Sequence, residues 1–189
     1  MRFALKLLAV LVIGTVLGVV ATRLSMRWFA PARVSDGAWK TNLLAGSSQS
    51  GPYWRAVVAI HGLFALNRSE SAYYTADTDS DGLQLNGQCR YEVAGPEPEA
   101  RWWSITAYGA NDYLIPNPAH RYSVSKTAVA REGDGTIRVQ VGGEAGGANW
   151  IPTGSGPFSL TLRLYNPGTE VITNPAHAAL PAIKKAACT

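Results

Sequence analysis

Three separated stretches of this 189-residue chain alternate between two faces with a period of two. In residues 102–108, Trp103, Ile105 and Ala107 share one face, and residues 137–141 and 158–165 repeat the pattern with aliphatic side chains and Phe158 on the apolar face. This is the period of a β-strand with one buried face. Turn segments rich in glycine and proline separate such stretches. We therefore predict a mainly β fold, an antiparallel β-sandwich or jelly-roll-like domain.

The remaining segments predict how the chain is divided. Residues 52–66 place apolar side chains at helical spacing behind Pro52, which predicts one short helix. Residues 31–51 are rich in small and polar side chains and predict a linker with a short turn near Trp39. The expected organisation is an N-terminal segment at 1–27, a linker at 28–51 and the β-sandwich domain at 52–189.

The N-terminal segment predicts a transmembrane helix. Residues 7–22 are apolar or small, with Lys6 before them and Arg23 after them. Arg27, Trp28 and Phe29 then supply basic and aromatic residues suited to a membrane interface, which favours a retained anchor. The alternative is a signal peptide cleaved after Ala21. From this signal-like design we expect a single-pass protein of a bacterial inner membrane, with the soluble domain in the periplasm.

Two further features of the sequence bear on partners. Gly14 and Gly18 have the GxxxG spacing that allows close helix packing, so a homodimer through these glycines is an open hypothesis. The net charge of +4 comes from the first 27 residues, because beyond Arg27 the basic and acidic residues balance. The domain therefore has no electrostatic signal for nucleic acid.

Aromatic and polar residues around the strand at 102–108 predict a ligand-binding surface. Aromatic platforms with a few fixed polar groups suit sugar-like or apolar ligands. The candidates are Trp102, Trp103, Asn117, Arg121, Tyr122, Asn149, Trp150 and Arg163. A structural interpretation stands beside this one: Asn117 and Arg121 would satisfy loop carbonyls, and Asn149 and Trp150 would hold and pack a turn.

Other residue types predict less chemistry. Asp77, Asp79 and Asp81 match the opening of a calcium loop, but Gln88 stands where the closing glutamate belongs, so a solvated acidic turn is the alternative. We find no nucleophile with a base, no carboxylate pair and no zinc spacing. We therefore expect no catalytic residue and no cofactor. The two cysteines, Cys89 and Cys188, are expected to form one disulfide in an exported domain.

Several motifs in order resemble a known family. They are ARWWSITAYGANDYLIPNPAHRYSV, a DGT turn, GGANWIPTGSGPFSLTLRLYNP and a closing PAI. Over about residues 53–185 the chain resembles the domain of unknown function 1214. The resemblance implies a β-sandwich or jelly-roll fold with no settled activity, and longer members carry this domain after a companion, the domain of unknown function 1254. Here an apolar segment stands in the companion's place, so we expect the companion half to be missing.

The resemblance and the residues together suggest two functions. The first is a membrane-anchored, non-catalytic binding or assembly module of the cell envelope, which works with a companion-domain protein. The alternative is an envelope enzyme that acts on a glycan or lipid-derived substrate in a pocket formed by the eight candidate residues.

Overall fold

The computed structural model describes residues 2–28, 33–42, 44, 46–60, 66–143 and 146–188. The chain divides into two compact units. A helical unit comprises Met1–Pro31 and Ser48–Phe64, and a β unit comprises Ala32–Ser47 and Ala65–Thr189.

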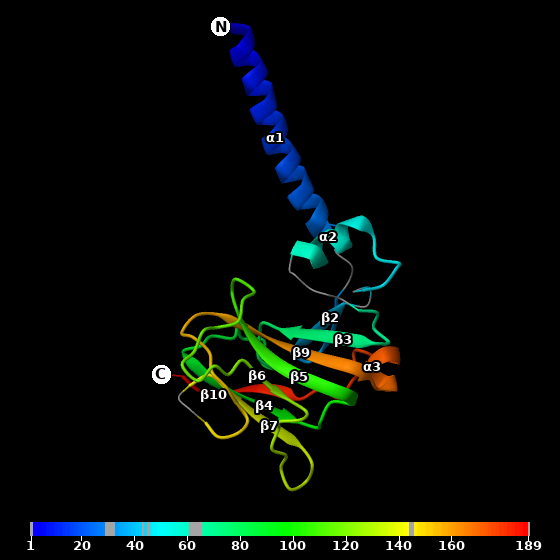
Figure 1. The fold of residues 1–189 in the computed structure, drawn as a ribbon, viewed down its shortest axis with the longest axis vertical. Helices are drawn as coiled ribbons and strands as arrows, with labels where there is room; N and C mark the ends of the chain where they lie inside the picture. Colours follow the sequence, from blue (N-terminus) through cyan, green and yellow to red (C-terminus); the bar gives the residue numbers. More distant parts are fainter. Residues whose placement is uncertain are drawn as a thin grey trace. The chain divides into compact units, whose positions relative to one another are not determined.

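The β unit contains two sheets, which appear as separate layers in Figure 1. The first sheet has six antiparallel strands in the order β1-β2-β3-β9-β5-β6. Its strands are β1 (Arg33–Asp36), β2 (Trp39–Asn42), β3 (Ser71–Ala76), β9 (Phe158–Pro167), β5 (Ala100–Gly109) and β6 (Ser123–Ser125). β9 and β5 are the long central strands, and their pairing extends from Ala100↔Pro167 to Gly109↔Phe158.

The second sheet has four strands in the order β10-β4-β7-β8. They are β10 (Ala182–Cys188), β4 (Cys89–Gly95), β7 (Ile137–Val141) and β8 (Trp150–Ile151). β10, β4 and β7 pair antiparallel, whereas β8 pairs parallel to β7. This sheet is therefore mixed, because the chain after β7 returns through a loop before β8 begins.

One hydrophobic core lies between the two sheets, as in a β-sandwich. Both inner faces contribute fully buried side chains. Those of the six-stranded sheet include Trp39, Trp103, Ile105, Leu160, Leu162 and Leu164, and those of the four-stranded sheet include Val93, Ile137, Val139, Val141, Ile151 and Ile183. Across the core, the rings of Tyr91 and Phe158 pack edge to face, with their centres 5.7 Å apart. The predicted mainly β fold class is confirmed.

The structure differs from the predicted linker. Residues 33–42 form the β1–β2 hairpin, which extends the six-stranded sheet through the pairing of β2 with β3. Trp39 explains the difference, since its side chain is 1% exposed and its Nε1 donates to the carbonyl of Pro181 at 2.7 Å. A buried indole of this kind fixes a strand that small and polar neighbours do not signal.

Two other differences concern short elements. A third helix, α3 (Thr169–Thr173), follows β9 and buries Val171. Residues 113–115 do not continue as a strand after β5 and contribute a single bridge, Tyr108↔Leu114, whereas β6 is the strand that pairs with the free edge of β5. Pro116 and Pro118 lack the amide hydrogens that a continued strand would need.

The helical unit contains α1 (Arg2–Trp28) and α2 (Pro52–Ile60). Residues Arg2–Ser25 of α1 are long and apolar enough to cross a membrane, as an anchor or as a signal sequence, and none of their most apolar window is buried by the protein. The short helix predicted at 52–66 is present as α2 up to Ile60. Residues 61–65, and Phe29 of the predicted interface collar, lie outside the described part of the chain.

Candidate functional site

One face of the six-stranded sheet points away from the core and carries aromatic, basic and hydroxyl side chains. Directly paired residues of an antiparallel ladder project to the same side. The register of β3, β9 and β5 therefore places these residues together, and we call them the outer face: Ser71, Tyr73, Thr75, Trp102, Ser104, Thr106, Tyr108, Ser159, Thr161, Arg163 and Tyr165.

Arg163 occupies the middle of the outer face, between Tyr73 on β3 and Ser104 on β5. Its Nη2 donates to the hydroxyl of Tyr108 at 2.7 Å, and its guanidinium carbon lies 5.3 Å from the centre of the Tyr108 ring. Tyr108 therefore holds the cation by a hydrogen bond to its hydroxyl and by a cation–π interaction with its ring. Arg163 remains half-buried, so this charge has a fixed position at the surface.

Small hydroxyl side chains lie between the larger groups of the outer face. Thr161 and Thr106 pair with each other in the row between Arg163 and Tyr108 and are 8% and 7% exposed. The side chain of Arg163 has to pass over this row to reach Tyr108, which accounts for their burial. The outer face is therefore a packed layer rather than a loose, fully solvated surface.

An aromatic pair lies at the other end of the outer face. Trp102 and Tyr165 are direct register partners, and their ring centres are 5.5 Å apart at a tilt of 57°. Both side chains are half-buried, so part of each ring is accessible. Exposed aromatic pairs of this kind are common anchors of binding surfaces.

The structure separates the eight predicted ligand-binding residues into three groups. Only Trp102 and Arg163 belong to the outer face. Trp103 is fully buried on the core face of β5, where its Nε1 donates to Glu97 at 3.0 Å, and Trp150 is 9% exposed with its Nε1 bonded to the carbonyl of Gly142 at 3.1 Å. The other four residues lie in or next to loops, and Tyr122 contributes its backbone carbonyl to Ala107 of β5.

Asn117 and Arg121 hold loop backbone, as the structural interpretation expects. The Asn117 side chain donates to the carbonyls of Ile115 and Arg121 and accepts the amide hydrogen of Arg121. The Arg121 guanidinium donates to the carbonyls of Gly147 and Ala148. These donors bind the protein's own carbonyls, so the geometry gives them a structural role.

Asn149 holds a third loop. Its Oδ1 accepts the amide hydrogen of Ala130 at 2.8 Å, and its Nδ2 donates to the carbonyls of Ala130 and Arg138 at 2.5 and 3.0 Å. Together with Arg121 it connects the loops near residues 115–122, 126–131 and 146–149. The polar candidates on these loops thus stabilise the end of the sandwich.

Glu97 is a half-buried carboxylate that connects separate parts of the chain, and the sequence did not indicate this role. Its carboxylate accepts two hydrogen bonds from Arg131, at 2.7 and 2.9 Å, and one from Trp103. The pKa of Glu97 is lowered from 4.5 to about 2, and the hydrogen bonds from Arg131 are the largest cause of this change. Glu97 and Arg131 are 34 residues apart, and only the tertiary fold brings them together.

The three aspartates of the weak calcium candidate do not converge. Asp77 pairs with Lys40 at 2.5 Å, and that hydrogen bond is the main reason why the pKa of Asp77 is lowered. Asp79 is buried and its Oδ1 accepts the amide hydrogens of Asp81 and Leu83, while Asp81 is exposed. Over the described residues, no three His, Cys, Asp or Glu side chains form a group that could hold a metal ion.

A disulfide joins Cys89 at the start of β4 to Cys188 at the end of β10. The two cysteines are direct register partners, with Cα atoms 3.9 Å apart, and their positions in the sequence differ by 99. The bond therefore fastens the edge strand β10 to its only neighbour among the described strands.

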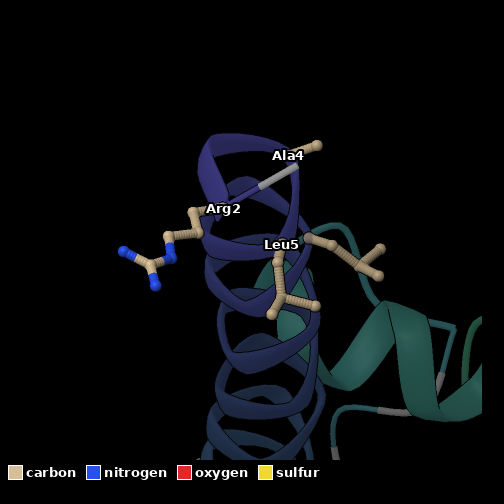
Figure 2. Close-up of a pocket in the computed structure, with 4 residues that line it drawn as sticks. Arg2, Ala4 and Leu5 are labelled. Carbon is tan, nitrogen blue, oxygen red and sulfur yellow. The ribbon is translucent and has the colours of Figure 1, made fainter.

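A recess on α1 is not a candidate site. It is lined by Arg2, Ala4, Leu5 and Leu8, all from the first turns of one helix. Figure 2 shows the side chains of Arg2 and Leu5 on different sides of that helix. The recess belongs to the apolar helix surface, and the outer face of the sandwich remains the best candidate for function.

These features define a class of protein, a two-sheet β-sandwich with a polar and aromatic sheet face and an N-terminal apolar helix. Residues 70–169, just over half of the chain, match the model of the family described as Protein of unknown function (DUF1214). The chain belongs to this family.

A solved structure shows the same fold in a longer protein. The VPA0106 protein from Vibrio parahaemolyticus matches with a TM-score of 0.62 and 24% identity over 74% of this chain and 36% of that chain. An uncharacterised protein from Burkholderia cenocepacia has a TM-score of 0.46 and 14% identity over 82% of this chain and 37% of that chain. The chain thus spans little more than a third of the length of either protein. No curated protein matches it.

Proposed function

We propose that this protein is a membrane-anchored, non-catalytic binding module of the cell envelope, whose outer face binds a protein with the companion 1254-type domain. The outer face carries the proposal. It combines an accessible aromatic pair, Trp102 and Tyr165, with Arg163 in a fixed position. Aromatic and arginine side chains are the residue types that contribute most to protein–protein interfaces.

The length of the Vibrio relative supports a protein partner. The matching region makes up 36% of that chain, so its remaining length has room for a further domain in the same polypeptide. In the proposed assembly, a companion-domain protein takes the corresponding place. The surface offered to it would be the sheet face that the sandwich's own core does not use.

The compartment is part of the proposal. With α1 as a retained anchor in a bacterial inner membrane, the β unit would face the periplasm. The disulfide between Cys89 and Cys188 supports this placement, because such bonds persist in oxidising compartments.

Binding is favoured over the predicted alternative of an envelope enzyme for a glycan or lipid-derived substrate. That alternative needs polar groups directed at a substrate. Asn117, Arg121 and Asn149 instead donate to the protein's own backbone carbonyls. We therefore assign the outer face to binding.

The test is affinity capture of the full-length protein from detergent-solubilised native membranes, followed by mass spectrometry. We expect a companion-domain protein in near-equal amount. Trp102→Ala and Arg163→Glu should each reduce its recovery at least tenfold, because interface anchors commonly contribute more than about 1.4 kcal/mol. The matched control is Tyr113→Ala, which removes an aromatic ring that is 74% exposed and outside the outer face.

Thermal unfolding of each variant checks that the sandwich persists. Undiminished recovery of the companion protein in both folded outer-face variants would refute the outer face as its binding surface. Capture of the protein without any companion-domain protein would refute the proposed partner itself.

A further inference from the structure

The nine residues of α2 include three apolar side chains that are exposed on one side of the helix. Tyr53, Ala56 and Ile60 follow one another at spacings of three and four residues, so they share one stripe of the helix. All three are exposed, Tyr53 by 42% and Ile60 by 69%. Trp54 and Val58 lie on another side of the helix and are half-buried. One apolar side of α2 is thus half-buried, and a second is exposed.

The position of α2 within its unit bears on what covers this stripe. α2 contacts α1 and belongs to the same compact unit, and Figure 1 shows it beside the C-terminal end of α1. α1 is the helix whose apolar surface is long enough to span a bilayer. Where α1 spans a membrane, α2 lies at the level where the spanning helix leaves the hydrocarbon.

The charge of the helical unit indicates the kind of membrane surface. Its two segments contain five basic residues and no acidic residue, whereas all 13 acidic residues belong to the β unit. The basic residues are Arg2, Lys6, Arg23, Arg27 and Arg55. Arg23 and Arg55 are exposed, and Arg23 is in the C-terminal part of α1, where α2 lies. Exposed cations beside an apolar stripe are typical of helices that lie in the interface of membranes with anionic lipids.

We infer that α2 is a second membrane contact, with its Tyr53–Ala56–Ile60 stripe in the acyl-chain boundary and Arg55 and Arg23 among anionic lipid headgroups. The inference rests on the proposed anchoring by α1. It adds a lipid preference that a spanning helix alone does not provide. The helical unit then contains one helix that crosses the bilayer, α1, and one that lies along its surface, α2.

The experiment places an environment-sensitive fluorophore on the stripe of the full-length protein. Ala56→Cys is labelled under non-reducing conditions, so that the Cys89–Cys188 disulfide stays intact, and the protein is reconstituted in nanodiscs of phosphatidylcholine with or without phosphatidylglycerol. In discs with phosphatidylglycerol we expect blue-shifted emission that brominated lipids quench. The same label at Thr127→Cys, an exposed position of the β unit, should show neither effect.

Two charge variants separate the apolar and electrostatic contributions in the Ala56→Cys background. Ile60→Glu should abolish quenching, whereas Leu83→Glu, the same change at an exposed leucine of the β unit, should leave it unchanged. Arg55→Glu should remove the difference between anionic and neutral discs, and high salt should reduce that difference in the unaltered chain.

The outcomes distinguish this inference from the anchor on which it rests. If alkaline carbonate extracts the protein from native membranes, the proposed anchor is wrong, and this inference is wrong with it. If the protein resists extraction but lipids do not quench the Ala56→Cys label, only the inference about α2 is wrong. A blue shift that is equal in both lipids and rises with the number of chains per disc would assign the stripe to a second copy and also overturn it.

Discussion

At the scale of single residues, Glu97 shows how much of the β unit depends on one carboxylate. It receives hydrogen bonds from Arg131 on a following loop and from Trp103 in the core, and the Lys126 ammonium lies 4.0 Å away. Its pKa is therefore about 2 instead of 4.5. This stabilisation is complete above pH 4.5, where Glu97 is ionised in both states, and is lost as the pH falls to about 2.

Glu97→Gln should accordingly lower the free energy of unfolding at pH 7 by about 1–3 kcal/mol, since hydrogen bonds to charged groups contribute amounts of this size. The difference from the unaltered protein should shrink below pH 4.5 and vanish near pH 2. Urea unfolding at several pH values measures it. Glu99→Gln, at an exposed position two residues away, is the control. A difference that does not change with pH would contradict the role given to the ionised carboxylate.

Sequence periodicity placed Trp102 and Trp103 on opposite faces of a strand, and the structure confirms this. Periodicity did not separate ligand-binding from structural roles for Arg121 and Asn149, because the carbonyls that they bind lie between 11 and 27 residues away in the sequence. The outer face was missed as a unit for the same reason. Tyr73 and Tyr108 come to lie beside Arg163 only through the order of strands in the sheet.

At the scale of elements, β10 depends on its pairing with β4. Most of β10 is exposed, and Ile183 is its fully buried side chain. The disulfide between Cys89 and Cys188 closes the end of this pairing. Closing a loop of this length restricts the unfolded chain strongly.

Replacing both cysteines by serine should therefore lower the free energy of unfolding by roughly 2–4 kcal/mol and speed amide exchange in β10 more than in β9. Hydrogen exchange with mass spectrometry measures both strands in one experiment. Equal protection of β10 in the unaltered and the altered protein would show that strand pairing alone holds it.

The helix α1 provides a second prediction at this scale. Nothing within 4 Å would obstruct a side chain at Gly14 or Gly18, so this small-residue surface is accessible to another helix. If two copies pack there, Gly14→Ile should abolish self-association in a membrane reporter assay, because the bulkier side chain separates the helices. Ala9→Ile at another small, exposed position of α1 is the control. An unchanged signal for Gly14→Ile would refute the dimer.

The elements that the sequence predicted well are those with a long alternating pattern, β5, β7 and β9. The ones that it missed are short. β8 has two residues and is held by its parallel pairing with β7, and the β1–β2 hairpin is held by Trp39 against Pro181. Such elements owe their existence to tertiary contacts rather than to local pattern.

At the scale of the whole molecule, the sequence of the helical unit is interrupted by the β1–β2 hairpin. The chain passes from α1 into the sandwich, returns to the helical unit for α2 and enters the sandwich again before β3. Removal of α1 would therefore leave α2 attached to the β unit with its apolar stripe. This arrangement favours a helical unit that stays whole over one that is processed.

The mature protein should therefore keep its N-terminal helix. Intact-mass measurement of protein from native membranes should give a chain that contains residues 2–21. The anchor interpretation predicts this result, since the basic and aromatic residues after the apolar segment suit a membrane interface. A mass that corresponds to a chain beginning at Thr22 would identify residues 1–21 as a signal peptide.

The pairing of β4 with β10 also sets an order of events during synthesis. At ribosomal rates of about 5–20 residues per second, β4 leaves the ribosome on the order of 5–20 s before β10. During that interval one edge of β4 is not yet paired with β10, and the thiol of Cys89 has not yet formed its disulfide with Cys188. The four-stranded sheet thus reaches its final form only when β10 arrives, and the disulfide can form only after Cys188 has been translated.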